Sequence, residues 1–307
     1  LEMYPYTQQN YLDQWSRGLL TEKGFVELSD WYQHWGYRWE YYRDILMLAK
    51  DHGLPVYGLN TPREVVTAVR TEGFEGLSEE DRTHVPPKVD VDDEDHLRLF
   101  RAHFEDDDEM HGMLSEEAMD GMFRAQCTWD AAMAWNAVQA LEQNPGDPIL
   151  VVLVGSGHVA YGLGIERQAR NFFDGEVATL IPIEVSDKGE PVDAVQASYA
   201  DYLWGVPEER FPLYPSLGVS LSGRIGPEPT KIIRVGEESP AEEAGLEVGD
   251  VLRGLDGIEI TESADLRRAM ADLAWGDAAT VTVERDGETS DVEVFFRRSS
   301  QWSEDDG

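Results

Sequence analysis

The sequence predicts an α/β domain, with a mostly parallel sheet and helices on both faces, followed by a small β-rich module. In the first two thirds, short apolar runs such as 149–154 alternate with long helical patterns such as 115–141. This alternation is typical of buried parallel strands joined by helices. After residue 215 the pattern changes to short strands around one amphipathic helix. The length of 307 residues also suits two domains, because single cores stop growing near about 250–300 residues.

The charge balance is strongly acidic. The chain has 25 basic and 61 acidic residues, a formal net charge of -36. Such a surface repels phosphate, so we expect no nucleic-acid partner. Acidic surfaces suit high salt, where a Debye length of about 3 Å at 1 M screens self-repulsion, and we therefore expect a halophilic source. Cys127 is the only cysteine, so no intrachain disulfide can form.

The first domain is expected to begin with helices. Residues 11–50 have a helical pattern rich in aromatic side chains, which we interpret as packing between helices. An aromatic wall for a flat ligand is the alternative. Residues 54–60 are predicted to form a short buried strand, and Thr61 is predicted to cap the next helix.

Three further elements complete this domain. Ser115 is predicted to cap a long helix, because two glutamates follow it at the positive helix end. Residues 149–154 are predicted to form a buried strand, and a last strand is expected near 177–185. Residues 207–215 carry prolines and aromatics and are predicted to link the two domains.

The first candidate site is the glycine-rich turn Gly155, Ser156, Gly157 and His158. It follows a predicted strand at its carboxyl end, where open α/β sheets bind ligands. The glycines allow backbone N–H groups to face a ligand, and His158 offers a metal ligand or a general base. A packed, hydrogen-bonded histidine is the structural alternative. The spacing up to Ala160 also fits a dinucleotide fingerprint, which normally belongs to the first βα turn of a domain.

The C-terminal module shows short strands and one helix. A hairpin is predicted around Asp286-Gly287, between strands at 280–284 and 291–296. A helix at 263–273 places Leu266 and Met270 on one face.

Its motifs resemble a PDZ domain over residues 216–299. The segment 239–252 is similar to the PDZ signature of bacterial periplasmic proteases and chaperones, and 216–219 matches the carboxylate-binding loop. Backbone N–H groups in this loop can hold a terminal carboxylate, and the peptide then adds as a strand against the helix. A PDZ fold that serves only dimer contacts is the alternative, which leaves a homodimer open. The predicted peptide-binding residues are Leu217, Gly218, Val219, Leu221, Leu266 and Met270.

Residues 1–206 resemble the ChaN-like haem-binding uptake family of the Tiki superfamily. The resemblance rests on 1–3, 54–64, 123–134 and the strand that leads into Gly-x-x-His. It implies two Gly-x-x-His motifs and an acidic residue, with His158 in the second motif and Glu2 as the acid. The first motif is expected upstream of Leu1, in an N-terminal segment absent from this chain.

The resemblance implies haem binding for bacterial iron acquisition at the cell envelope, on the periplasmic side, with a lipid anchor left open. Haem needs an axial ligand, and the haem or metal candidates are His158, Glu2, His103 and His111. The second hypothesis is a metal-dependent hydrolase, with a divalent ion on His158 and Glu2 and with substrate peptides presented by the PDZ module. A third is an envelope scaffold that recruits a partner through the PDZ module.

Overall fold

A computed structural model describes most of the chain, and its contacts divide the chain into two compact units. Unit 1 comprises residues 1–29 and 45–208, and unit 2 comprises 30–44 and 209–307. None of the described helices is long and apolar enough to cross a membrane. The described residues are 1–105, 115–144, 146, 148–186, 195–196, 198–208, 212–222 and 230–297.

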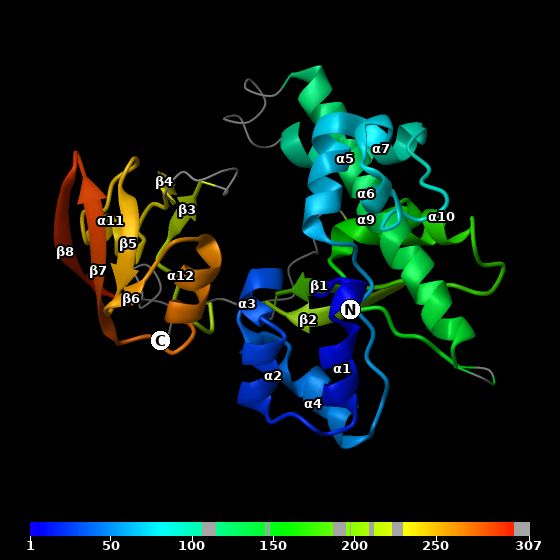
Figure 1. The fold of residues 1–307 in the computed structure, drawn as a ribbon, viewed down its shortest axis with the longest axis horizontal. Coiled ribbons are helices and arrows are strands. Elements are labelled where there is room, and N and C mark those ends of the chain that lie inside the picture. Colours follow the sequence, from blue (N-terminus) through cyan, green and yellow to red (C-terminus); the bar gives the residue numbers. More distant parts are fainter. Residues whose placement is uncertain are drawn as a thin grey trace. The chain divides into compact units, whose positions relative to one another are not determined.

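Unit 1 is largely helical, and its long helix α9 (Glu116–Glu142) packs against α5, α7 and α10 (Figure 1). Gly121 allows the close approach to α5, since a Cβ there would lie 2.5 Å from the Arg70 carbonyl oxygen. Its other helices are α1 (Gln9–Ser16), α2 (Glu22–Leu28), α4 (Arg43–Asp51, which begins in unit 2), α5 (Arg63–Gly76), α6 (Glu79–Arg82), α7 (Glu94–Glu105) and α10 (Ile165–Ala169).

Helix starts depend on local hydrogen bonds. Ser115 caps α9 as predicted, because its Oγ accepts a hydrogen bond from the Ala118 N–H at 3.2 Å. The prediction for Thr61 is wrong. Helix α5 begins at Arg63 with Pro62 as its N-cap, and the Thr61 hydroxyl instead donates to the His84 carbonyl at 2.8 Å.

The parallel strands of unit 1 are β1 (Leu180–Val185) and β2 (Tyr202–Pro207), which pair from Leu180↔Tyr202 onward. The α/β class is confirmed, although the parallel sheet among the described residues has two strands. Residues 54–60 and 149–154 are extended without belonging to a described strand. They run on either side of the N-terminal segment, where Glu2 N–H donates to the Leu153 carbonyl at 3.1 Å and Leu59 N–H donates to the Leu1 carbonyl at 3.0 Å.

The predicted burial of 149–154 is wrong for one of its two faces. Ile149 is 92% exposed and Val151 is 73% exposed. The intervening side chains Leu150, Val152 and Val154 are partly buried against the cluster that contains Met133 and Ile165. Successive side chains of an extended segment point to opposite faces, so packing against α9 and α10 covers only one of them.

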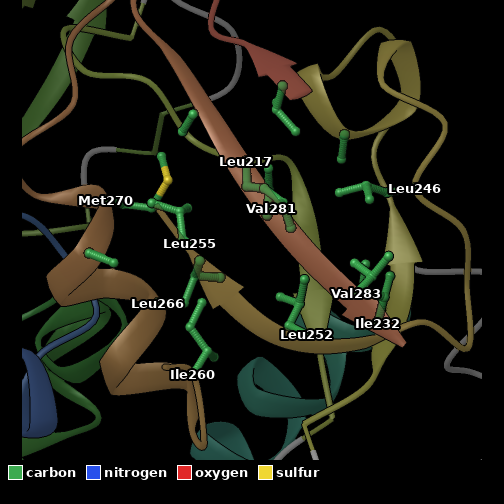
Figure 2. Packing of buried hydrophobic residues seen from close by; sticks show 14 of the residues in the cluster. Leu217, Ile232, Leu246, Leu252, Leu255, Ile260, Leu266, Met270, Val281 and Val283 are labelled. Atoms are coloured by element: carbon green, nitrogen blue, oxygen red, sulfur yellow. The ribbon is translucent and has the colours of Figure 1, made fainter. Parts of the chain in front are cut away.

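Unit 2 contains the β-rich module, and its β-rich character is confirmed. Figure 2 shows its core, in which Leu217, Leu252 and Val281 pack between the sheet and α12 (Ser263–Met270). The hairpin turns at Asp286 and Gly287, which both have positive φ, as a type I′ turn requires. Its strands are β3 (Val219–Leu221) paired with β4 (Ile232–Val235), and the sheet β6 (Ile258–Glu259), β5 (Val251–Leu255), β7 (Ala278–Arg285) and β8 (Glu288–Phe295); α11 spans Pro240–Glu243.

The segment 30–44 also belongs to unit 2, with α3 (Trp31–His34) and a short 3-10 turn at Trp39–Tyr41. Arg267 on α12 donates two hydrogen bonds to the Tyr32 carbonyl, at 3.0 and 2.8 Å. Arg38 donates to the Leu273 carbonyl at 2.8 Å and also to the Ala271 carbonyl, just beyond the end of α12. These bonds anchor the segment on α12 and on the residues that follow it, and one of them satisfies the carbonyl of Ala271, the C-cap of α12.

An ion pair between Asp250 and Arg285 lies beside β5. Asp250 is 1% exposed and accepts hydrogen bonds from Arg285 Nε and Nη2 at 2.6 and 2.7 Å. The Arg285 guanidinium holds the pKa of Asp250 below its usual value of 3.8. The stability contributed by this depressed pKa is therefore present above pH 3.8 and is lost as the pH falls through the folded-state pKa.

We expect Asp250→Asn to lower the free energy of unfolding by about 1–2 kcal/mol at pH 7, because a charge-assisted pair is lost. The gap should be smaller at pH 3, because the stability linked to the depressed pKa of Asp250 begins to be lost below pH 3.8. Urea denaturation of the full chain at both pH values measures it. A gap of equal size at pH 7 and pH 3 would contradict the assigned electrostatic origin.

Candidate functional site

The turn at 155–158 brings His158 between two carboxylates from distant parts of unit 1. His158 Nδ1 lies 2.5 Å from Asp130 Oδ1 on α9, and Nε2 lies 3.4 Å from Glu2 Oε1. Asp130 is fully buried, whereas the His158 side chain is 14% exposed. The imidazole is thus fixed from the protein side by Asp130 and remains reachable from outside.

Backbone geometry holds this turn in place. The Gly155 N–H donates to Glu2 Oε2 at 2.6 Å, so the predicted glycine loop orients the acid. Ser156 and Gly157 form a 3-10 turn with His158. Gly164 packs directly under this turn, because a Cβ there would lie 2.1 Å from the His158 carbonyl oxygen. Position 164 therefore requires glycine for the turn to keep its shape.

The electrostatics of the site favour a charged imidazole. Burial lowers the pKa of His158, but the hydrogen bonds with Asp130 and Glu2 outweigh it and raise the pKa to about 10. Burial raises the pKa of Glu2, and its hydrogen bonds with His158 and the Gly155 N–H reverse this and lower it. A pKa raised this far favours the imidazolium form of His158 at neutral pH.

A second layer surrounds Asp130. Asp130 Oδ2 is buried without a hydrogen-bond partner among the described residues, and His96 Nε2 lies 3.7 Å from it. His96 Nδ1 accepts a hydrogen bond from Arg167 Nη2 at 3.1 Å, and burial lowers the pKa of His96. The Gln126 amide lies 2.9 Å from His158 Nδ1. A neutral His96 thus faces the same carboxylate that orients His158.

Neither His96 nor Asp130 was predicted from the sequence as a site residue. One signal was available: Gln126 and Asp130 are polar residues one helical turn apart on the mostly apolar face of α9. The predicted pair of His158 and Glu2 is brought together. His111 and the side chain of His103 lie outside the described residues.

The dinucleotide-binding and metal-site hypotheses for this region can also be compared with the geometry. The turn at 155–158 continues into a second 3-10 turn, Ala160–Gly162, and α10 begins only at Ile165. A dinucleotide fingerprint requires the glycines to open a helix, so the structure argues against it. Across the described part of the chain, no group of three or more His, Cys, Asp or Glu side chains is arranged to hold a metal ion.

Unit 2 contains a cavity of about 610 Å³ between β3, α12 and the segment 30–44. Five of the six predicted peptide-binding residues line it, and Leu221 instead packs against the core beside it. Leu217, Leu266 and Met270, labelled in Figure 2, serve both the core and the cavity floor. The lining residues from the predicted set are Leu217, Gly218, Val219, Leu266 and Met270.

The loop before β3 turns two amide groups toward this cavity. The Leu217 carbonyl accepts a hydrogen bond from Ala241 N–H at 3.0 Å, and the Gly218 carbonyl accepts one from Gly236 N–H at 2.8 Å. In a trans peptide the following N–H points opposite to the carbonyl. The N–H groups of Gly218 and Val219 therefore point away from the module core, as a carboxylate-binding loop requires.

The far wall of this cavity comes from the aromatic run for which helix packing was predicted, with an aromatic wall for a flat ligand as the alternative. Tyr32, Tyr37 and Tyr41 from the segment 30–44 line the cavity together with Tyr214. Tyr41 packs edge-on against Tyr214 with ring centroids 5.2 Å apart, and the Arg38 guanidinium lies 4.3 Å from the centre of the Tyr214 ring. Part of the aromatic run that we interpreted as helix packing therefore forms a tyrosine wall along this cavity.

Comparison with known families assigns a family to each of the two domains. A family model described as haem-binding uptake, Tiki superfamily, ChaN, matches residues 1–168, more than half of the chain. The chain belongs to the ChaN family. A PDZ domain model matches residues 215–295, so a ChaN-type domain is followed by a PDZ domain in the same chain.

Two relatives of this ChaN-family chain each match only part of it. Protein RETICULATA-RELATED 5, chloroplastic, of Arabidopsis thaliana is 28% identical over 168 residues, which are 53% of this chain and 22% of that protein. A probable periplasmic serine endoprotease DegP-like of Ectopseudomonas mendocina is 40% identical over 63 residues, which are 20% of this chain and 13% of that protein. The chain thus spans about a fifth or less of these relatives.

Among solved structures, the HtrA-type protease AlgW with decapeptide is similar over 27% of this chain and 28% of that chain. The sequence identity is 20% and the TM-score is 0.25.

Proposed function

We propose that this chain is a haem-binding protein of bacterial iron or haem uptake, in which His158 is the axial ligand of the iron. We further propose that its PDZ domain binds the C-termini of other polypeptides at the periplasmic side of the cell envelope. The observation that carries the haem proposal is the fixed imidazole. Its Nδ1 is held 2.5 Å from the buried Asp130 carboxylate, which leaves Nε2 as the donor atom. Metal-bound histidines are usually oriented by such a carboxylate.

His158 fits this group as a nitrogen ligand of the iron. Haem needs an N, O or S ligand in a largely desolvated site, and the His158 ring is 14% exposed. Asp130 keeps the proton on Nδ1 and so fixes the tautomer. To offer the Nε2 lone pair, the ring must release one proton to solvent, because the lowered pKa of Glu2 makes that carboxylate a weak acceptor. Bound haem would supply the iron, which His158 would hold through Nε2.

The envelope location has indirect support. The PDZ resemblance is to periplasmic proteins, and the DegP-like relative that matches this module is described as probably periplasmic. The cavity in unit 2 is lined by the loop whose amides face outward, which supports capture of a carboxylate end. The hydrolase hypothesis rests on His158 and Glu2 alone, and no further observation in the described residues favours it.

Titration of ferric haem into the full chain, followed by the Soret band, tests the haem proposal. We expect a saturable, shifted band for the wild type and its loss in His158→Ala. His52→Ala is the matched control, because His52 is exposed in the same unit, and it should bind like the wild type. Equal haem affinity in all three proteins would refute His158 as the ligand.

A further inference from the structure

We propose that the PDZ cavity selects polypeptide C-termini whose last residue is apolar and whose next-to-last residue is acidic, with Arg234 as the residue that recognises the acid. The inference rests on the proposed peptide-binding function and names the chemistry of the partner. It is carried by the charges that line the cavity and by the pairing of β3 with β4.

The cavity lining has a charge opposite to that of the chain. Acidic residues outnumber basic residues by 61 to 25 along the sequence. The described lining nevertheless contains Arg38, Arg234 and Arg267 and no Asp or Glu. The charged residues of the cavity are thus all basic, whereas the chain as a whole is acidic. An anionic ligand is attracted to such a cavity and repelled by the acidic surface elsewhere.

Two of these arginines are already used by the fold. Arg38 donates to the carbonyls that follow α12 and lies 3.5 Å from Glu40 Oε2, and Arg267 donates to the Tyr32 carbonyl. Arg234 is exposed on β4 and forms no ion pair with any described residue. It is therefore the cation that remains available to a ligand.

Strand register places Arg234 beside the outward face of an added peptide. Arg234 lies directly opposite Ser220 on β3, so the two side chains share one face of the β3–β4 pair. Val219 and Leu221, the neighbours of Ser220, pack against the core on the other face. A peptide that adds along β3 follows the same alternation.

This alternation assigns the last two ligand residues. With the terminal carboxylate at the N–H groups of Gly218 and Val219, the last side chain points inward, toward Leu217 and Met270. The next-to-last side chain then points outward, to the face of Arg234. Strands lie about 4.8 Å apart, so the peptide and β4 are roughly 10 Å apart. A glutamate and an arginine side chain together span that gap.

Binding of fluorescein-labelled heptapeptides to the full chain, followed by anisotropy at low salt, tests this assignment. The probes share one sequence and end in Glu-Leu, Gln-Leu or Lys-Leu, and a fourth ends in Glu-Leu amide. The protein variants are Arg234→Ala and Arg234→Glu. Arg253→Ala is the control, because Arg253 is an arginine of the same module that pairs with Glu284 and does not line the cavity.

We expect the wild type and Arg253→Ala to prefer Glu-Leu over Gln-Leu by about threefold, as a partly exposed ion pair allows, and over Lys-Leu by more. Arg234→Ala should remove the preference, and Arg234→Glu should reverse it toward Lys-Leu. High salt should weaken the preference. Equal binding of all three free-acid peptides, with no binding of the amide, would overturn the role of Arg234 and leave C-terminal recognition intact. Binding of none of the peptides, or equal binding of the amide, would overturn the peptide function itself.

Discussion

Replacing Gly218 with alanine is expected to abolish peptide binding and to lower the free energy of unfolding of unit 2 by about 2–4 kcal/mol. Gly218 has a φ of +81°, and an added Cβ would lie 2.2 Å from the Ser239 Cβ. Relieving this clash moves the loop whose amides face the cavity. Urea denaturation and peptide anisotropy on the full chain measure the two effects.

Gly245→Ala is the matched control for the backbone contribution. Gly245 has nearly the same φ, +79°, but a Cβ there would meet no atom within 4 Å. We expect it to cost about 1 kcal/mol and to leave peptide affinity unchanged. If Gly218→Ala bound peptide as well as Gly245→Ala does, the carboxylate loop would be misassigned.

The second large effect is expected for Asp130→Asn, on the pKa of His158 and on haem affinity. Removing the carboxylate charge should lower the pKa of His158 from about 10 toward its usual value near 6.5, because the hydrogen bond with Asp130 is the largest contribution that raises it. The ring should also lose its fixed orientation, so haem affinity should fall by roughly 10–100-fold at a pH where the ring is neutral in both proteins. NMR titration of the His158 ring and haem titration measure the two effects separately.

The same ion pair has a pH signature in the haem-free protein. Because the folded-state pKa of His158 is raised, its contribution to stability is fully present below about pH 6.5. That contribution is lost as the pH rises through about 10.

Asp120→Asn is the control for Asp130→Asn, because Asp120 is a 59% exposed acid on the same helix. An unchanged His158 pKa in Asp130→Asn would contradict the assigned coupling.

Features set by local chemistry could be predicted from the sequence. The Ser115 cap needs only the N–H groups of the next turn, and the hairpin at Asp286-Gly287 needs only positive φ. The association of Glu2 with His158 came from the family resemblance. Asp130, the closest contact of His158, was not predicted, because its partner lies 28 residues away and only the packed helix brings them together.

The segment 30–44 shows why other features of the fold and of the candidate sites could not be predicted from the sequence. Its aromatic residues have the composition of a helix-packing surface, and nothing in their spacing reveals a contact with α12, more than 200 residues later. Arg38 and Arg267 make that contact through backbone carbonyls, which carry no sequence signal. The exposure of Ile149 similarly depends on which neighbours cover an extended segment, and hydrophobicity alone does not specify them.

The most direct test of the account is electron paramagnetic resonance of ferric haem bound to the full chain, with histidines labelled by ¹⁵N. The account predicts a ¹⁵N coupling from one imidazole nitrogen at the iron that is present in the wild type and His52→Ala and absent in His158→Ala. An unchanged coupling in His158→Ala, or no histidine coupling in the wild type, would contradict it.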